Sequence, residues 1–395
     1  MRITKPKPGE GIRLKYTGTR EPRYEVFIDT APRGATRQRV TRTFRTISEA
    51  RAFIIETRQR VAEGNYTAPS RVTFRTLAED YLKSRRDVRE NTLAGYRDAL
   101  VNVSDVFGDR PAQTITRRDV DALMERLETK GGRRGRPLSH RSLVYALQVT
   151  RQVFAYGVSV GVLHANVAID VKVRRKRKED DKEVTIWTPA ELARFVGHVD
   201  AAGDEWERAA FRLTACGLRR SEVLGLAWSS VDLDAGTIRV EASRTKTGSG
   251  YATSRDDTKS RASTRTVHVE QVLPGTVAAL RALRAAQARD RLAAGPAWTG
   301  SDLVVVDALG EGIHPEVYSG RWRALLKSSG LSPIRLHSVR HTIATALHRA
   351  GVAPADAAGM LGHEVATHIS FYVQSTETGA ASAAARLGEV LAAAE

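Results

Sequence analysis

Near the start of the chain, apolar and polar residues alternate in the pattern that is typical of short β-strands. The alternation covers positions 24–28 and 40–44, and Ser48 stands before a helical stripe of apolar residues that ends near Gly64. We expect two or three strands followed by a helix that Ser48 caps. Residues 1–66 are therefore predicted to form a small ββ(β)α domain.

Residues 71–172 instead carry apolar side chains three and four positions apart, which is the spacing of amphipathic helices. Thr116 followed by Asp119 resembles a capping box, and Ser139 is a second candidate for an N-cap. The pattern predicts about four short helices packed as a bundle. The apolar residues that we assign to its core include Phe74, Leu77, Ala78, Tyr81, Val120, Leu123, Leu127, Leu143, Leu147 and Phe154.

A change of composition separates this bundle from the rest of the chain. Residues 173–183 are almost all charged, so we expect a linker there and a third domain over 184–395. A basic linker of this kind either lies along a phosphate backbone or is simply solvated. Together the patterns predict a mainly α-helical protein with small β-sheets, divided into three domains.

The third domain is predicted to have a mixed α+β fold. Thr188-Pro189 followed by Glu191 is a strong helix start, because proline is favoured in the first turn. The other expected elements are a helix over 205–215 that stops at Gly217, a short helix over 221–228, strands over 237–241 and 265–269, a polar stretch over 243–263 with room for a third strand, and mainly helices from Tyr318 onward.

Charge points to a nucleic acid as the partner of this chain. Its 62 Lys and Arg against 45 Asp and Glu give a formal charge of +17, and a protein this basic usually binds a polyanion. The single cysteine, Cys216, excludes an internal disulfide and any CxxC metal site. No stretch reaches the roughly 20 apolar residues of a membrane span, and the first residues lack a signal peptide. We expect a cytoplasmic protein that associates with the nucleoid.

The last domain contains two arginines, two histidines and a tyrosine that lie in or just after three short sequence strings. Arg219 lies in GLRRSEVLGLAW, His337 and Arg340 lie in HSVRHT, His363 ends LGH, and Tyr372 follows nine residues later. Attack on a phosphodiester adds negative charge to the phosphoryl oxygens, and planar guanidinium groups stabilise that charge without losing a proton. We interpret the arginines as phosphate ligands, the histidines as proton and hydrogen-bond partners, and Tyr372 as the nucleophile.

These strings, in this order, resemble those of the tyrosine recombinases, the lambda-integrase-like family. The resemblance implies cleavage and rejoining of DNA through a 3′-phosphotyrosyl intermediate, without a metal, ATP or another cofactor. It also implies supporting roles for Glu222, which would orient Arg219, and for His341. In this family a lysine of a β-hairpin protonates the leaving oxygen; Lys259 has the best matching context, and Lys246 is a competitor.

The resemblance also assigns DNA contacts outside the strings. It implies that residues 1–66 bind arm sites and 71–172 bind core sites of double-stranded DNA, and solvated basic faces are the alternative. It implies a homotetramer on DNA, with a host bending protein or a directionality factor as accessory partners. The helical tail predicted after Tyr372 docks on a neighbouring protomer or on its own domain. The candidate DNA contacts are Arg37, Arg39, Arg42, Arg133, Arg134, Arg136 and Arg220.

Within this family we expect an integrase of phage or mobile-element type. A chromosome-dimer-resolving recombinase is the first alternative, although such enzymes generally lack an additional domain like residues 1–66. A type IB topoisomerase would use similar residues without site preference. A catalytically inert DNA-binding regulator is the alternative from another class, but it would not need all five residues of the strings.

Overall fold

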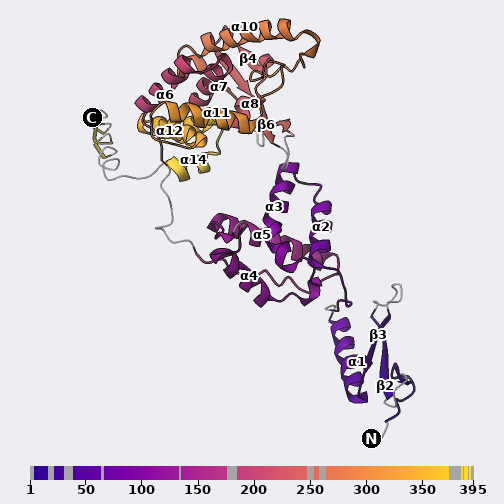
Figure 1. The fold of residues 1–395 in the computed structure, drawn as a ribbon. Coiled ribbons are helices and arrows are strands. Elements are labelled where there is room, and N and C mark those ends of the chain that lie inside the picture. The colour runs from indigo at the N-terminus through magenta and orange to yellow at the C-terminus, as the bar shows by residue number, and fades with distance from the viewer. Residues whose placement is uncertain are drawn as a thin grey trace. The chain divides into compact units, whose positions relative to one another are not determined.

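The computed structural model describes residues 4–16, 22–30, 39–63, 66–132, 135–175, 185–246, 253–257 and 264–372, and short helical segments between 384 and 392. For 256, 257 and 370–372 it describes the backbone but not the side chains. The chain divides into two compact units, Met1–Asp180 and Asp181–Glu395 (Figure 1).

The first unit opens with a three-stranded antiparallel sheet and a helix. β1 (Ile12–Tyr16), β2 (Pro22–Asp29) and β3 (Arg39–Phe44) pair in that order, and α1 (Ile47–Ala62) packs against β2 and β3. The small core between the sheet and α1 contains Tyr24, Val26, Ile28, Ala50 and Ile54. The alternation at 24–28 therefore correctly predicted which face of β2 is buried.

Helix α1 begins earlier than the sequence pattern indicated. Its N-cap is Thr46, whose hydroxyl accepts from the Glu49 amide at 3.2 Å while the Glu49 carboxylate accepts from the Thr46 amide at 3.2 Å. The prediction that Ser48 is the cap was wrong. Thr46 has a glutamate three residues later and so forms a capping box, whereas Ser48 is followed at that distance by Arg51.

The rest of the first unit is a helical bundle. It consists of α2 (Phe74–Ser84), α3 (Glu90–Phe107), α4 (Arg117–Thr129) and α5 (His140–Ser159). The rings of Phe74, Phe107 and Phe154 meet in its core, with the ring centre of Phe74 at 6.0 Å from Phe107 and 5.6 Å from Phe154. The predicted N-caps Thr116 and Ser139 are confirmed.

The second unit combines two small sheets with helices. β4 (Val231–Asp232), β5 (Thr237–Val240) and β8 (Arg265–Val267) form one antiparallel sheet, and β6 (Ala242–Lys246) and β7 (Thr253–Asp257) form a hairpin. Trp187, Phe195, Phe211, Tyr318 and Trp322 form the aromatic centre of its core. The helices are α6 (Pro189–Ala202), α7 (Glu205–Ala215), α8 (Arg220–Gly225), α9 (Val269–Val272), α10 (Thr276–Ala294), α11 (Pro315–Ser328), α12 (Leu336–Arg349), α13 (Pro354–Leu361) and α14 (Val365–Tyr372).

Helix α8 is shorter than the predicted 221–228. It ends at Gly225, and a 3-10 turn at Trp228–Ser230 follows. Strand β6 passes so close that a Cβ atom on Gly225 would lie 2.8 Å from the Arg244 amide nitrogen. This contact comes from a distant part of the chain, so local periodicity did not reveal it.

The strands of the second unit also differ in detail from the prediction. The polar stretch 243–263 contributes to two paired strands rather than one, because β6 and β7 form a hairpin. The strand expected over 265–269 ends at Val267, since Val269 already begins α9. The predicted helix over 205–215 and its stop at Gly217, which adopts φ +94°, are confirmed.

We predict opposite stability effects for two glycine-to-alanine substitutions. Gly225→Ala forces a methyl group against β6 and should lower the free energy of unfolding by about 1–3 kcal/mol. Gly197→Ala, in α6 and with open space around it, should raise it by about 0.5–1 kcal/mol. All five tryptophans lie in the second unit, so urea unfolding followed by tryptophan fluorescence reports this unit. Equal shifts of both variants would contradict the close approach of β6.

Candidate active site

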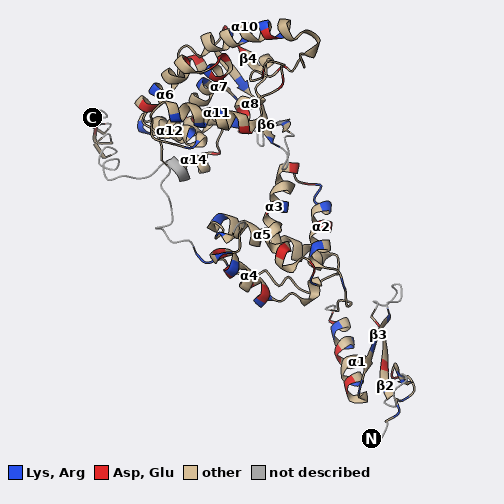
Figure 2. Ribbon diagram, in the orientation of Figure 1, with Lys and Arg blue, Asp and Glu red and all other residues tan. Residues whose placement is uncertain are grey.

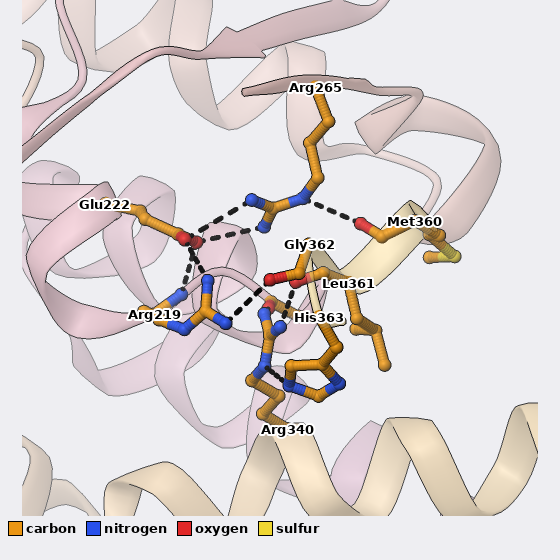
Figure 3. Close-up of polar contacts among 9 residues, drawn as sticks. Arg219, Glu222, Arg265, Arg340, Met360, Leu361, Gly362 and His363 are labelled. Carbon is orange, nitrogen blue, oxygen red and sulfur yellow. Dashed lines mark hydrogen bonds and ion pairs between the residues drawn. The ribbon is translucent and has the colours of Figure 1, made fainter. Parts of the chain in front are cut away.

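Three arginines bind three successive backbone carbonyls at the C-terminal end of α13 (Figure 3). The pairs are Arg265 with Met360 at 2.8 Å, Arg340 with Leu361, and Arg219 with Gly362 at 2.8 Å. The last carbonyls of a helix lack intrahelical donors and carry partial negative charge, so cationic donors are favoured there. The three arginines come from β8, α12 and the start of α8, and this short helix end therefore gathers distant segments.

Gly362 shapes the helix end that the arginines bind. It adopts a left-handed conformation, with φ +62° and ψ +50°, and the His363 amide donates back to the Ala358 carbonyl at 2.9 Å. Glycine takes this conformation without the strain that a side chain would add. The turn ends α13 and brings His363 directly beside the arginines.

Arg219 occupies the N-cap position of α8, and Glu222 holds it there. The Glu222 carboxylate accepts from the Arg219 amide at 2.9 Å and from its guanidinium at 2.6 Å. The Arg219 side chain is 30% exposed, whereas that of Glu222 is 3% exposed. The structure thus brings these two predicted residues together and leaves the arginine accessible.

Glu222 has a second cationic partner, Arg265 from β8. One guanidinium nitrogen of Arg265 lies 2.9 Å from the carboxylate, and a second lies 3.3 Å away. Burial alone would raise the pKa of Glu222, but the hydrogen bond and charge of Arg265, with the charge of Arg219, lower that pKa below its ordinary value. The carboxylate is therefore ionised at neutral pH.

Arg340 is the most deeply placed of the three arginines, at 2% exposed. It donates from one terminal nitrogen to the Gly217 carbonyl at 2.7 Å, and from Nε to Nε2 of His363 at 2.9 Å. Burial, followed by the charges of Arg340 and Arg219, lowers the pKa of His363 to about 3. His363 is therefore a neutral imidazole at physiological pH.

His337 and His341 lie on α12 with Arg340. Their rings are perpendicular, with centres 5.1 Å apart. Burial is the largest cause that lowers the pKa of each, and the charge of Arg340 adds to it. A neutral imidazole can accept a proton, so the site favours the basic form of both side chains.

Tyr372 is the last residue of α14, and its side chain lies outside the described residues. The helix packs against α12 and α13. His368 precedes Tyr372 by four residues, is 1% exposed, and has its ring centre 5.9 Å from that of His363. The backbone therefore carries Tyr372 one turn beyond a histidine that is packed against the arginine cluster.

Two other candidates, Lys246 and Arg220, bind residues of α11. Lys259 falls in 258–263, outside the described residues. Lys246 on β6 forms an ion pair with Glu316 at 2.5 Å. Arg220 turns toward α11, where it donates to the Ser319 hydroxyl at 2.7 Å.

The candidate DNA contacts in the first unit are spread over different surfaces. Arg39 lies 4.2 Å from the centre of the Phe27 ring, on the face of the sheet that points away from α1. Arg42 pairs with the buried Val26 and therefore lies on the other face, 5.3 Å from the ring of Phe53. Figure 2 shows acidic positions interspersed with basic ones along α1 and α4. Arg136 is exposed, and Arg37, Arg133 and Arg134 lie outside the described residues.

Sequence reasoning missed Arg265, which binds both Glu222 and α13. Alternation along β8 places it on the same face as Val267, which is 2% exposed. A buried guanidinium requires a compensating carboxylate, so this alternation was a usable signal. It does not say which carboxylate is the partner.

In the parts of the chain that the structure describes, none of the helices is long and apolar enough to cross a membrane. The same residues contain no group of three or more His, Cys, Asp or Glu arranged to hold a metal ion.

We predict that His363 makes the second unit sensitive to acid. The folded state keeps this imidazole neutral down to about pH 3, whereas the unfolded chain protonates it below its ordinary pKa near 6.5. Stability should therefore fall as pH drops through 6.5, by up to about 2 kcal/mol from this residue at pH 5. The free energy of unfolding of the wild type should fall between pH 7 and pH 5. In His363→Gln this fall should be smaller by the contribution of His363.

The measurement is urea unfolding by tryptophan fluorescence at the two pH values. His268→Gln is the matched control, because His268 is an exposed histidine of the same unit. Equal pH sensitivity in the two variants would contradict the neutral state of His363.

Comparisons with known proteins relate this chain to integrases and recombinases. Residues 186–378 match the model of the phage integrase family. Tyrosine recombinase XerC of Alcanivorax borkumensis is 28% identical over 174 residues, covering 42% of this chain. The chain spans about half the length of this relative, 53%.

Two solved structures share the fold. The Tn1549 transposon integrase in complex with transposon right end DNA has a TM-score of 0.64 at 19% identity, covering 80% of this chain and 100% of that chain. A lambda integrase tetramer bound to a Holliday junction has a TM-score of 0.53 at 17% identity, covering 91% of this chain and 97% of that chain. Residues 186–378 are thus a phage integrase family domain.

Proposed function

We propose that this protein is a site-specific DNA recombinase of the integrase type, which integrates or excises phage or mobile-element DNA. The observation that carries the proposal is the convergence of Arg219, Arg340 and His363 at the end of α13, beside the helix that ends in Tyr372. This arrangement offers fixed positive charge and neutral imidazoles next to the helix that carries Tyr372. Those groups suit attack on a phosphodiester.

The proposed reaction exchanges one phosphate ester for another. The Tyr372 oxygen attacks the scissile phosphorus, the bond to the 5′-oxygen breaks, and a 3′-phosphotyrosyl bond and a free 5′-hydroxyl result. Arg219 and Arg340 stabilise the charge that develops on the non-bridging oxygens. A free phenol has a pKa of about 10, so a basic neighbour must take its proton, and His337 is our candidate. Attack by a 5′-hydroxyl from another strand then reverses the chemistry.

The leaving 5′-oxygen needs a proton, for which we propose Lys259. Its competitor Lys246 is engaged with Glu316 at 2.5 Å. That ion pair directs the ammonium group of Lys246 toward the Glu316 carboxylate on α11. The engagement of Lys246 favours Lys259, which lies six residues before the start of β8 in the sequence.

We further propose that the protein acts on double-stranded DNA as a homotetramer. The charge of +17 supports binding to a polyanion. The similar lambda integrase is a tetramer on a Holliday junction, and the similar Tn1549 integrase is in complex with DNA. Residues 1–66 would then bind arm sites, 71–172 core sites, and accessory host or directionality factors would set the direction of the reaction.

A chromosome-resolving recombinase is the second candidate, favoured by the similarity to XerC. The sheet and α1 of residues 1–66 favour the integrase instead, because resolving recombinases generally lack such an additional domain, and the similar lambda integrase structure covers 91% of this chain. The positions of cleavage in the genome separate the two. Cleavage at the ends of an inserted element supports an integrase, and cleavage at one chromosomal site supports a resolving enzyme.

We predict that Tyr372→Phe abolishes covalent attachment to DNA, because phenylalanine lacks the attacking oxygen. The wild type and the variant are incubated with fragmented DNA of the source genome, and DNA bound covalently to protein is recovered and its ends sequenced. Tyr16→Phe, which changes an exposed tyrosine of β1, is the control and should leave the adducts unchanged. Adducts that persist in Tyr372→Phe would move the nucleophile elsewhere. Adducts at random positions would indicate a topoisomerase, and none from the wild type would favour an inert DNA-binding protein.

We also predict that a better leaving group rescues the loss of Lys259. Lys259→Ala should slow cleavage of a mapped site by about 10²–10⁴-fold, the usual contribution of a general acid. A duplex with sulfur in place of the leaving 5′-oxygen should restore the rate, since a thiolate departs without a proton. Lys246→Ala is the matched variant, and rescue of that variant alone would assign the role to Lys246.

A further inference from the structure

Arg265 connects three elements of the second unit, although it is almost inaccessible to DNA. Its side chain is 7% exposed, and that of Glu222 is 3% exposed. The guanidinium binds the Glu222 carboxylate of α8 at 2.9 Å and the Met360 carbonyl of α13 at 2.8 Å. One planar group therefore joins β8, α8 and α13 (Figure 3).

The two arginines that share Glu222 are not equivalent. Arg219 is 30% exposed and can reach a phosphate, whereas Arg265 is buried beneath the same carboxylate. A buried carboxylate between two guanidinium groups is held in one place by opposed hydrogen bonds. The position of Arg219 therefore depends on where Arg265 places Glu222.

Arg265 also fixes the backbone before His363. Its donation to Met360 lies two residues before Gly362, whose carbonyl accepts from Arg219. Arg219 is thus bound by the Glu222 carboxylate and by the end of α13. Arg265 contacts both of these groups. A displacement of about 1 Å at such a site can lower a rate about 100-fold.

We propose, on the basis of the recombinase function above, that Arg265 is a positioning residue. It holds the Glu222 carboxylate and the end of α13 together, and so orients Arg219 and His363 toward the scissile phosphate. Without it, Arg219 is the one remaining guanidinium partner of Glu222 among the described residues, and it turns toward that carboxylate and away from Gly362. DNA binding elsewhere on the protein does not change.

The first test measures cleavage and binding separately on a duplex that carries a site mapped with the wild type. Arg265→Gln should lower the single-turnover rate of adduct formation about 100-fold and change the Kd for the duplex less than twofold. Arg265→Lys keeps the charge but lacks the planar fork that binds both partners, and it guards against a loss caused by misfolding. Its single-turnover rate should fall at least about tenfold. Arg239→Gln is the control, because Arg239 is exposed on the neighbouring strand β5 and pairs with Glu241 at 3.1 Å.

The pH profile separates positioning from simple support of the fold. The charged groups that face Glu222 are Arg219 beside α8, Arg265 on β8 and His337 on α12. Removing Arg265 raises the pKa of the buried carboxyl, so the rate of Arg265→Gln should fall further than that of the wild type between pH 8 and pH 6. The double variant Arg265→Gln/Glu222→Gln should lose this additional pH dependence, because its glutamine at 222 cannot be protonated in this range. The wild type and both variants contain the same histidines, so the histidines cannot cause the difference.

A crystal structure of Arg265→Gln gives a readout that does not require activity. We expect the contact between Arg219 and the Gly362 carbonyl to be lost. An unchanged contact, wild-type rates in both variants of Arg265, or a slow variant with an unchanged pH profile would overturn the inference. Absence of adducts from the wild type would instead overturn the proposed function, and the crystal structure would still decide the role of Arg265.

Discussion

The candidate active site depends on how three buried or half-buried guanidinium groups are kept close together. Arg219, Arg265 and Arg340 repel one another, and the Glu222 carboxylate binds two of them. The carbonyls at the end of α13 and that of Gly217 supply further partial negative charge. A phosphodiester beside these guanidinium groups would bring negative charge that they stabilise.

Burial, reinforced by the same charge, explains the state of the histidines. Burial and the nearby arginines lower the pKa of His337, His341 and His363, so all three favour the neutral form. A site that must accept a proton from a phenol needs this form, because an imidazolium has no free lone pair. Under the proposed function the fixed cations would thus serve two purposes: they would attract the phosphate, and together with burial they keep the neighbouring imidazoles neutral.

The sequence predicted the parts of this arrangement that depend on neighbouring residues. The caps at Thr116, Ser139 and Thr188 and the end of α7 followed from local hydrogen-bonding rules. Local patterns did not predict the early end of α8, where Gly225 is in close contact with Arg244 of β6, 19 residues later in the sequence. The role of Arg265 was missed because it also depends on distant residues. Its partners Glu222 and Met360 lie 43 and 95 residues from it, and only the folded chain brings them together.

The contacts of Arg340 have a consequence for how such a protein evolves. Arg340 lies in one sequence string, yet it binds Gly217 of another and Leu361 of a third, while Arg219 of the first binds Gly362 of the third. A methyl group on Gly217 would also lie 2.7 Å from the Leu361 side chain. The three strings therefore form one interlocked block, in which a substitution in one string disturbs the other two. Every contact of this block lies within the second unit, so substitutions in the first unit can accumulate without breaking any of them.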